Sequence, residues 1–257
     1  MKDRIVTKEE RQRIQLQMLR EIDTFCRQKG IRYSLSNGTL LGAIRHGGYI
    51  PWDDDVDIVM TLPDMLRFKK EFRSKDLKYC DIDTEPHFEF PFSRIAYQPT
   101  YAKKGMTFKT CGINIDLYPV LGLPQTKEGI NQFFEDASNR RESLLHLRKW
   151  NYRLRNRLPI NALPFYDRQI RKYRDFLYSY PYEGTNYFFH YGGFIRWSKV
   201  FDCDLFAEMT DIIFEGEKFM AFSDWDGYLH HVYGDYMQLP PEDQRQPYHN
   251  EKYYWKR

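Results

Sequence analysis

The chain has 257 residues, which is enough for one large domain, with or without a long insertion, and for a buried hydrophobic core. Hydrophobic residues make up 42% and aromatic residues 17% of the sequence, and this content excludes an intrinsically disordered chain. The 39 Lys and Arg residues nearly balance the 36 Asp and Glu residues, so the net charge of +3 argues against a nucleic-acid-binding protein and leaves an anionic small substrate open.

The first half of the chain is predicted to alternate helices with strands. Apolar residues at helical spacing predict an amphipathic helix over residues 8–29, and Gly30 is expected to end it. Shorter helices are predicted over residues 38–45 and 62–73, with Pro63 in the first turn of the latter. Strands are predicted over residues 33–36, 56–60, 78–84, 92–97 and 113–120.

The second half is predicted to be mostly helical. Helices are expected over residues 127–157, 165–179 and 224–233, and a hairpin over residues 211–221 with its turn at Glu215-Gly216. The predicted fold class is therefore α/β (α+β), with a mixed sheet flanked by helices and a mostly helical C-terminal part. We expect residues 1–124 to form the core domain and residues 125–257 to pack with that core as one unit.

The N-terminal residues, the lack of a long apolar run and the cysteines lead us to expect a soluble, cytoplasmic protein. The first residues are highly charged and lack the apolar segment of a signal peptide, and no apolar run approaches the roughly 18 residues of a membrane span. The four cysteines, Cys26, Cys80, Cys111 and Cys203, do not have the spacing of a zinc finger. We therefore expect reduced thiols and no structural zinc site.

An acidic cluster, Asp53-Asp54-Asp55-Val56-Asp57, is the most informative feature of the sequence. It is either a solvated acidic turn or a cation site, because close carboxylates repel one another unless a cation lies among them. The apolar strand that follows directly, Ile58-Val59-Met60, favours the cation site. Since side chains two residues apart on a strand share a face, Asp55 and Asp57 are predicted to bind Mg²⁺ together.

Two further segments complete the predicted site. The alternation of residues 113–117 puts Asn114 and Asp116 on one face of a strand, so Asp116 is the candidate third carboxylate. Gly38-Thr39 lies at a predicted strand-to-helix turn, where backbone N–H groups can approach a phosphate closely. The combination indicates metal-dependent phosphate chemistry.

Three blocks carry a resemblance to a known family: residues 37–57 (NGTLLGAIRHGGYIPWDDDVD), residues 113–119, and a C-terminal block formed by Tyr228-Leu229 and residues 233–241. They resemble the LicD family, which includes bacterial phosphocholine transferases and animal fukutin-related ribitol-phosphate transferases. The family belongs to the nucleotidyltransferase superfamily, so the resemblance implies a nucleotidyltransferase-like mixed sheet in the core. The blocks are spread over most of the chain.

The resemblance implies transfer of a phospho-alcohol group from a CDP-linked donor to a hydroxyl group, with release of CMP. CDP-choline is the expected donor, and donors that carry ethanolamine, ribitol or glycerol stay open. The expected acceptor is a cell-surface glycan or its lipid-linked precursor, such as teichoic acid, lipopolysaccharide or capsule. Neither a nucleic acid partner nor a transmembrane segment is expected, and contact with the inner face of a membrane would come through the substrate or a partner.

The resemblance also assigns roles to the candidate residues. Asp55 and Asp57 would hold one or two Mg²⁺ (or Mn²⁺) ions against the donor diphosphate. Asp116 would either share the second ion or accept the proton of the attacking hydroxyl. Gly38 and Thr39 would hold the donor phosphates.

Three more residues are candidates for donor binding. Arg45 and Arg94 would neutralise phosphate charge, although any single Arg is more often a surface charge. Trp52 either stacks on the cytosine base, forms part of a cage for a quaternary ammonium group, or anchors its loop. Residues 125–200 are expected to select the acceptor.

Two other functions are compatible with the same motifs. An enzyme of this fold can transfer a nucleoside monophosphate to a small molecule or a sugar, or the chain can be a binding protein without activity. The presence of all three aspartates argues against an inactive protein.

Overall fold

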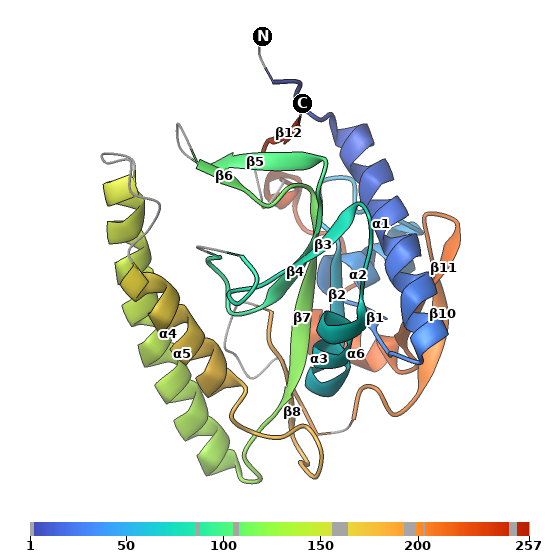
Figure 1. The fold of residues 1–257 in the computed structure, drawn as a ribbon. Coiled ribbons are helices and arrows are strands. Elements are labelled where there is room, and N and C mark those ends of the chain that lie inside the picture. Colours follow the sequence, from blue (N-terminus) through green and yellow to red (C-terminus); the bar gives the residue numbers. More distant parts are fainter. Residues whose placement is uncertain are drawn as a thin grey trace.

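A mixed β-sheet forms the centre of the fold (Figure 1). The computed structural model describes residues 3–85, 88–104, 108–155, 164–192, 199–202, 204–246 and 251–256. Five strands of the sheet follow the order β1 (Ser34–Leu35), β2 (Asp57–Thr61), β7 (Asn114–Gly122), β4 (Ser93–Tyr97), β3 (Leu77–Cys80). Two more strands, β8 (Phe188–His190) and β9 (Val200–Phe201), extend the sheet from the end of β7.

The strands β2 and β7 form the buried centre of this sheet. They pair in parallel, whereas all the other pairs in the sheet are antiparallel. Every residue of both strands is buried, as expected for parallel strands that are covered on both faces. The predictions of these two strands from their apolar residues are confirmed.

Three helices of the first half are confirmed; α1 has the predicted bounds, α2 is one residue longer at each end, and α3 ends two residues earlier than predicted. Helix α1 (Lys8–Lys29) starts with a capping box between Thr7 and Glu10 and ends at Gly30, whose φ is +62°. Its buried face includes Ile14 and Ile22. Helix α2 (Asn37–His46) follows β1 and leads into the acidic loop, and α3 (Leu62–Glu71) follows β2 with Thr61 as its N-cap.

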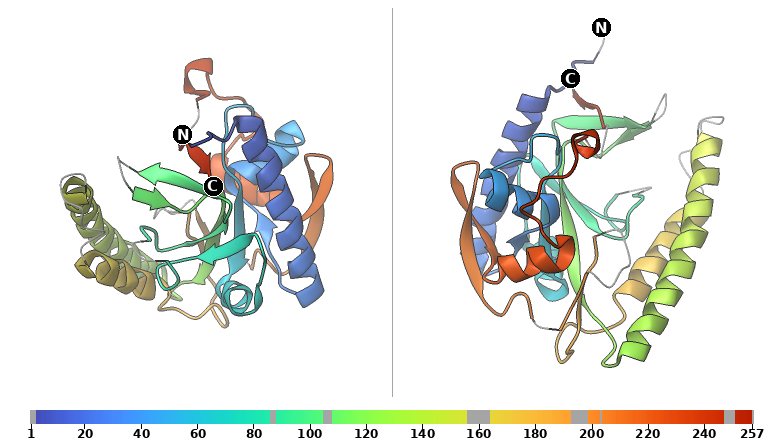
Figure 2. Two further views of the ribbon diagram at one scale, coloured as in Figure 1. Left: turned by 45° about the horizontal axis from the view of Figure 1, so that its top comes forward. Right: turned by 180° about the vertical axis from the view of Figure 1, so that it is seen from behind.

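The first two helices of the second half lie on the other side of the sheet from α1 (Figures 1 and 2). Helix α4 (Lys127–Arg155) and helix α5 (Pro164–Leu177) form an antiparallel pair in which the rings of Phe133 and Phe176 stack at 5.1 Å. The rings of Phe134 and Phe189 lie 5.2 Å apart, so this pair is joined to β8 of the main sheet. The predicted helix over residues 127–157 is confirmed to residue 155, and its last two residues lie outside the described residues.

The predicted hairpin is confirmed together with its turn. Strands β10 (Met209–Phe214) and β11 (Glu217–Phe222) pair antiparallel, and Glu215 and Gly216 have positive φ values of 52° and 78°. Such values are required at the two central residues of a tight hairpin turn. The predicted helix that follows is α6 (Trp225–Tyr233).

Several short strands are absent from the sequence-based prediction. A separate sheet consists of β12 (Tyr253–Trp255), β5 (Thr100–Lys104) and β6 (Phe108–Thr110), and a 3-10 helix, η2 (Glu242–Gln244), precedes β12. Strands of two or three residues, such as β8 and β9, are too short to show an alternating pattern. The α+β class is confirmed, whereas the division at residue 124 stays a prediction. Among the described helices, none combines the length and apolar character needed to cross a lipid bilayer.

Candidate active site

Asp57, Asp116 and Arg94 lie side by side on three adjacent strands. Asp57 begins β2 and is paired with Asp116 of β7, which is in turn paired with Arg94 of β4. Side chains of directly paired residues project to the same face of a sheet. The sheet therefore brings two predicted carboxylates and one predicted cation together, although they come from distant parts of the sequence.

Asp57 carries a buried oxygen that has no hydrogen-bond partner. Its Oδ2 accepts a hydrogen bond from the side-chain amide of Asn37 at 3.1 Å, whereas Oδ1 accepts none from the described part of the chain. Burial, followed by the charges of Asp116 and Asp53, raises the pKa of Asp57 well above its usual value. A buried carboxylate oxygen without a donor fits a divalent cation as its missing partner.

Asp55 belongs to the same group of charges. Burial raises the pKa of its carboxyl group, and the nearby Asp57 and Asp53 raise it further. One oxygen atom each of Asp53, Asp54 and Asp55 lies within 4.8 Å of the other two. Asp54 differs from the others because its Oδ2 forms an ion pair with Arg11 of α1 at 2.9 Å. Within the acidic cluster, Asp54 therefore ties the loop to α1, whereas Asp53, Asp55 and Asp57 line a cavity.

Asp116 has donors at both of its oxygens. Its Oδ1 accepts a hydrogen bond from Asn114 at 2.6 Å and lies 2.7 Å from Nε of Arg94. Its Oδ2 accepts hydrogen bonds from Arg94 and Tyr118, both at 3.2 Å. The predicted common face of Asn114 and Asp116 is confirmed by their contact. The guanidinium group of Arg94 also lies over the ring of Phe90, 4.2 Å from its centroid.

Gly38 and Thr39 hold the acidic loop against the start of α2. A side chain at Gly38 would place its Cβ 2.3 Å from an oxygen of Asp53, so the glycine is needed for this close approach. The hydroxyl oxygen of Thr39 accepts the backbone N–H of Asp57 at 2.8 Å. This bond fixes the first residue of β2 relative to the helix. Phosphate binding by these two residues stays a prediction.

Asn37 and Lys199 extend the site beyond the residues that the sequence indicates. Lys199, which directly precedes β9, donates a hydrogen bond from Nζ to Oδ1 of Asn37 at 2.6 Å. The same Asn37 side chain donates to Asp57, and its backbone has a positive φ of 47°, which Asn tolerates better than most residues. Lys199 is only 9% exposed. No motif surrounds this lysine in the sequence, so only the fold reveals it.

These side chains line a cavity of about 1090 Å³. Its walls come from the sheet, from α2 with the acidic loop, from α4 and α5, and from the segment that follows α6. Of the predicted site residues, the cavity is lined by Gly38, Arg45, Trp52, Asp55, Asp57, Arg94 and Asp116. A cavity of this size is large enough for a nucleotide-linked substrate.

Comparison with known proteins supports the same assignment. Residues 30–122 match the family model described as LicD/FKTN/FKRP, nucleotidyltransferase domain. The chain is 26% identical to the lipopolysaccharide cholinephosphotransferase LicD of Haemophilus influenzae over 271 residues, which cover 97% of this chain and 98% of that protein. Residues 30–122 of the chain therefore form a LicD-type nucleotidyltransferase domain. A shorter match of 36 residues is 58% identical to the ribitol 5-phosphate transferase FKRP of Homo sapiens and covers 14% of this chain and 7% of that protein.

The LicD-family relationship confirms that the chain is a phosphotransferase enzyme. All eight predicted site residues fall within the matched nucleotidyltransferase domain, residues 30–122. Lys199 and the residues after α6 lie outside it. The three candidate carboxylates thus lie in the matched domain, whereas several residues that enclose them come from the rest of the chain.

Arg45 links the LicD-family domain to the segment after α6. Its guanidinium group donates to the backbone carbonyl oxygen of Tyr236 at 2.7 Å, and it lies 3.4 Å from that of Gln238. Trp52 lies in the same region. Its ring is edge-on to that of His46, with the centroids 6.0 Å apart, and the guanidinium group of Arg245 lies over the Trp52 ring, 5.6 Å from its centroid. Arg45 thus holds the C-terminal segment at the cavity, and Trp52 already contacts a cation of that segment.

His190 and Tyr228 form a buried polar pair behind the cavity of this LicD-family enzyme. The Tyr228 hydroxyl lies 2.9 Å from Nδ1 of His190 and accepts the backbone N–H of Asn37 at 3.4 Å. Burial, and to a smaller extent the charge of Lys199, lowers the pKa of His190 well below its usual value. The pair therefore connects β8 and α6 to the first residue of α2.

Proposed function

We propose that this LicD-family enzyme transfers a phospho-alcohol group, with phosphocholine as the preferred group, from a CDP-linked donor to a hydroxyl group of a glycan or of its lipid-linked precursor. CMP is the second product. The observation that carries the proposal is the buried Oδ1 of Asp57, which lacks a hydrogen-bond partner within the described residues. The charge of Asp116 raises the pKa of Asp57, and the charge of Asp57 raises that of Asp55, so the three carboxylates act on one another.

The acidic side chains suit Mg²⁺ or Mn²⁺ as the cofactor. Asp55 and Asp57 would hold the ion through hard carboxylate oxygens. Asp116, which is paired with Asp57 across the sheet, would add a third negative charge on the same face. The bound ion supplies positive charge that offsets the charge of the donor diphosphate. This set of ligands would make transfer depend on a divalent cation, because a bound cation relieves the repulsion among the ionised carboxylates.

The cations of the cavity suit the donor phosphates. Lys199 is held at the acidic face by Asn37, and Arg45, in the last turn of α2, also lines the cavity. Transfer of a phosphoryl group needs positioning and charge neutralisation more than covalent catalysis. Lys199 and Arg45 are placed to orient an anionic donor, whereas Arg94 is already paired with Asp116.

Asp116 either shares the cation or accepts the proton of the attacking hydroxyl. Its oxygens already accept hydrogen bonds from Asn114, Arg94 and Tyr118. Either role therefore requires the longer contacts, those at 3.2 Å to Arg94 and Tyr118, to give way when substrate binds.

The aromatic lining of the cavity suits a choline group. The rings come from the segment before β4, from β7, from α5 and from the residue after β8: Phe90, Phe92, Tyr118, Tyr166, Tyr173 and Tyr191. Aromatic faces attract quaternary ammonium groups, and Glu89 and Glu251 add negative charge to the same cavity. The relative from Haemophilus influenzae is named as a cholinephosphotransferase, which agrees with this preference.

The proposal is tested by incubating the purified chain with Mg²⁺, a glycan acceptor and each of CDP-choline, CDP-ethanolamine, CDP-ribitol and CDP-glycerol. We expect CMP and a phospho-alcohol-modified acceptor in equal amounts, with CDP-choline as the best donor. An acceptor that carries a nucleotide would show instead that the enzyme is a nucleotidyltransferase. If no donor yields any product, the proposed activity is wrong.

A further inference from the structure

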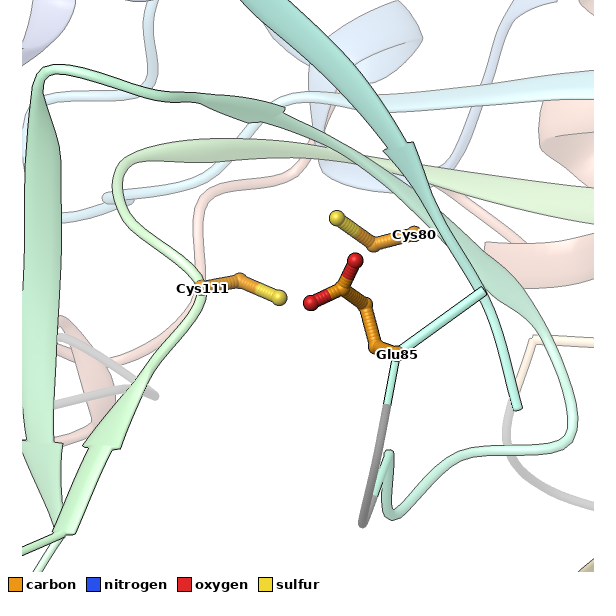
Figure 3. Close-up of side chains that lie close together, drawn as sticks. All are labelled: Cys80, Glu85 and Cys111. Carbon is orange, nitrogen blue, oxygen red and sulfur yellow. The ribbon is translucent and has the colours of Figure 1, made fainter. Parts of the chain in front are cut away.

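A second group of potential metal ligands lies at the edge of the main sheet. Cys80, Glu85 and Cys111 each direct one ligand atom toward the others, and these three atoms lie within 4.8 Å of one another (Figure 3). Cys80 ends β3, Glu85 follows in the next turn, and Cys111 lies between β6 and β7. The two cysteines are distant in sequence, so their spacing resembles no metal motif.

The turn after β3 fixes Glu85 beside Cys80. Oδ1 of Asp81 accepts the backbone N–H groups of Asp83 and Thr84, both at 2.9 Å. The backbone N–H of Glu85 donates to the carbonyl oxygen of Asp81 at 2.9 Å. Because the turn is closed by these bonds, the Glu85 carboxylate is held next to the thiol without help from a ligand.

The position of Cys111 is fixed by the residue that follows it. A side chain at Gly112 would place its Cβ 2.3 Å from Oγ1 of Thr100 and 2.6 Å from the carbonyl oxygen of Tyr97. Only glycine allows the backbone to pass so close to this turn. The same Thr100 hydroxyl accepts the backbone N–H of Ile113 at 3.0 Å. Both ligand-bearing segments are therefore ordered before any metal binds.

A second cavity of about 320 Å³ opens onto the three side chains. Cys80, Glu85 and Cys111 all line it, and so does Arg94 of the active site. The side chain of Glu85 is 22% exposed and forms an ion pair with Lys78. An entering cation can thus reach the ligands, and the cavity has room for a water molecule as a further ligand.

We propose that Cys80, Cys111 and Glu85 bind a zinc ion, with a water molecule from the second cavity as the fourth ligand. Two thiolates and one carboxylate suit tetrahedral zinc, whereas Mg²⁺ and Mn²⁺ prefer sites built of oxygen alone. Binding forms two Zn–S bonds and one Zn–O bond, and the two thiol protons are released to solvent. This site replaces the expectation, drawn from cysteine spacing, that the chain holds no zinc.

The proposed zinc site adjoins the active site through the sheet. Cys80 is the direct cross-strand partner of Arg94, and Arg94 is the partner of Asp116. The metal would tie the end of β3 to the segment that enters β7. Its expected effect is therefore to stabilise the strand neighbours of Arg94, and it takes no part in the transfer reaction.

The test measures metal content and does not depend on enzyme activity. The full chain is purified from zinc-supplemented medium, and bound metal is counted by mass spectrometry. We expect about one zinc ion per chain in the wild type and in the D55N/D57N double variant, and almost none in C80S or C111S. Cys26→Ala is the matched control, since Cys26 is a buried cysteine of α1 and should leave the zinc content unchanged.

Cobalt substitution of the wild-type chain keeps the test valid if a cysteine variant does not fold. Co²⁺ bound by two thiolates gives a sulfur-to-metal charge-transfer band and the intense visible bands of a tetrahedral site. Loss of these bands when Zn²⁺ is added supports the proposal. The proposal is overturned if the wild type holds no zinc and shows no such bands, if C80S and C111S retain the metal, or if intact mass shows a Cys80–Cys111 disulfide.

Discussion

At the level of single side chains, Asn37 connects the acidic and basic groups of the active site. Its amide nitrogen donates to Asp57 and its amide oxygen accepts from Lys199. The charge of Lys199 also lowers the pKa of Asp57, against the larger upward effects of burial and of Asp116. The cation is thus held beside the carboxylates, where it can also contact a donor phosphate.

Replacing Lys199 with Met should weaken donor binding. A charge-assisted hydrogen bond contributes about 1.5–3 kcal/mol, so we expect KM for the CDP-linked donor to rise about 10- to 100-fold. Steady-state kinetics at saturating acceptor measures the effect. The matched control is Lys218→Met, a change at an exposed lysine of β11 that should leave KM unaltered. Equal KM values for the two variants would remove Lys199 from the donor site.

The hydroxyl group of Thr39 should matter for stability through the backbone of Asp57. Thr39→Val keeps the shape of the side chain but leaves the buried N–H of Asp57 without its acceptor. We expect a loss of about 1–3 kcal/mol in the free energy of unfolding, measured by urea denaturation. Thr39→Ser retains the hydroxyl and should lose much less. If the Thr39→Val variant were as stable as the Thr39→Ser variant, the hydrogen bond between Thr39 and Asp57 would not hold α2 to β2.

At the level of elements, the sequence predicts those whose pattern is local. The helix α1 has a capping box, a regular apolar face and a terminal glycine, and the β10–β11 turn has two residues suited to positive φ. These signals are contained within the element itself. The alternation of residues 113–117 likewise identifies Asp116 as a candidate carboxylate, and the structure pairs it with Asp57 at the start of β2.

The elements that sequence reasoning misses depend on tertiary contacts. The strand β8 has three residues and pairs with β7, and β9 has two residues and pairs with β8, so each is a strand because a neighbouring strand provides an edge for pairing. The same dependence hides Lys199, which reaches the site because β9 follows it. It also hides the meeting of Cys80 and Cys111, which come from opposite ends of the β3–β6 region.

The contact between β8 and α6 should make stability depend on pH. The folded-state pKa of His190 is lowered, so the folded chain binds this proton less readily than the unfolded chain does. Its contribution to stability is therefore complete above the unfolded pKa of about 6.5 and is lost as the pH falls toward the folded pKa. The limiting slope for one proton is about 1.4 kcal/mol per pH unit.

The dependence of the free energy of unfolding on pH is measured by urea unfolding of the wild type and of His190→Asn at several pH values from about 8 to about 5. The wild type should lose stability more steeply than the variant as the pH falls, because Asn carries no ionisable group. Parallel curves for the two proteins would show that His190 does not become protonated on unfolding.

At the level of the whole molecule, the active site is assembled from both halves of the chain. The LicD-family domain contributes the carboxylates, whereas α4, α5, Lys199 and the segment after α6 enclose the cavity. Strands from the second half join the sheet of the first, and β12 near the end of the chain pairs with β5. The family motifs therefore locate the candidate carboxylates, while the walls of the cavity depend on the complete fold.

The crowding of carboxylates should couple folding to metal binding. A ligand at about 100 times its Kd stabilises the folded state by about 2.7 kcal/mol, so Mg²⁺ should raise the melting temperature of the wild-type chain. Without metal, Asp57→Asn should be more stable than the wild type, because it removes one of the charges that raise the pKa of Asp55. Added Mg²⁺ should shift the variant little. Differential scanning calorimetry with and without Mg²⁺ tests both expectations.

The claim that Asp57 carries the transfer reaction is tested most directly by comparing Asp57→Asn with Asp54→Asn. CMP formation from CDP-choline is followed in the presence of Mg²⁺ and acceptor. Asp57→Asn should lose at least about 100-fold in rate, since even indirect partners of a metal site cost 10- to 100-fold. Asp54→Asn removes the charge that pairs with Arg11, at a residue that does not line the cavity, and should retain most of the rate when folded. Equal rates for the wild type and Asp57→Asn would contradict the account.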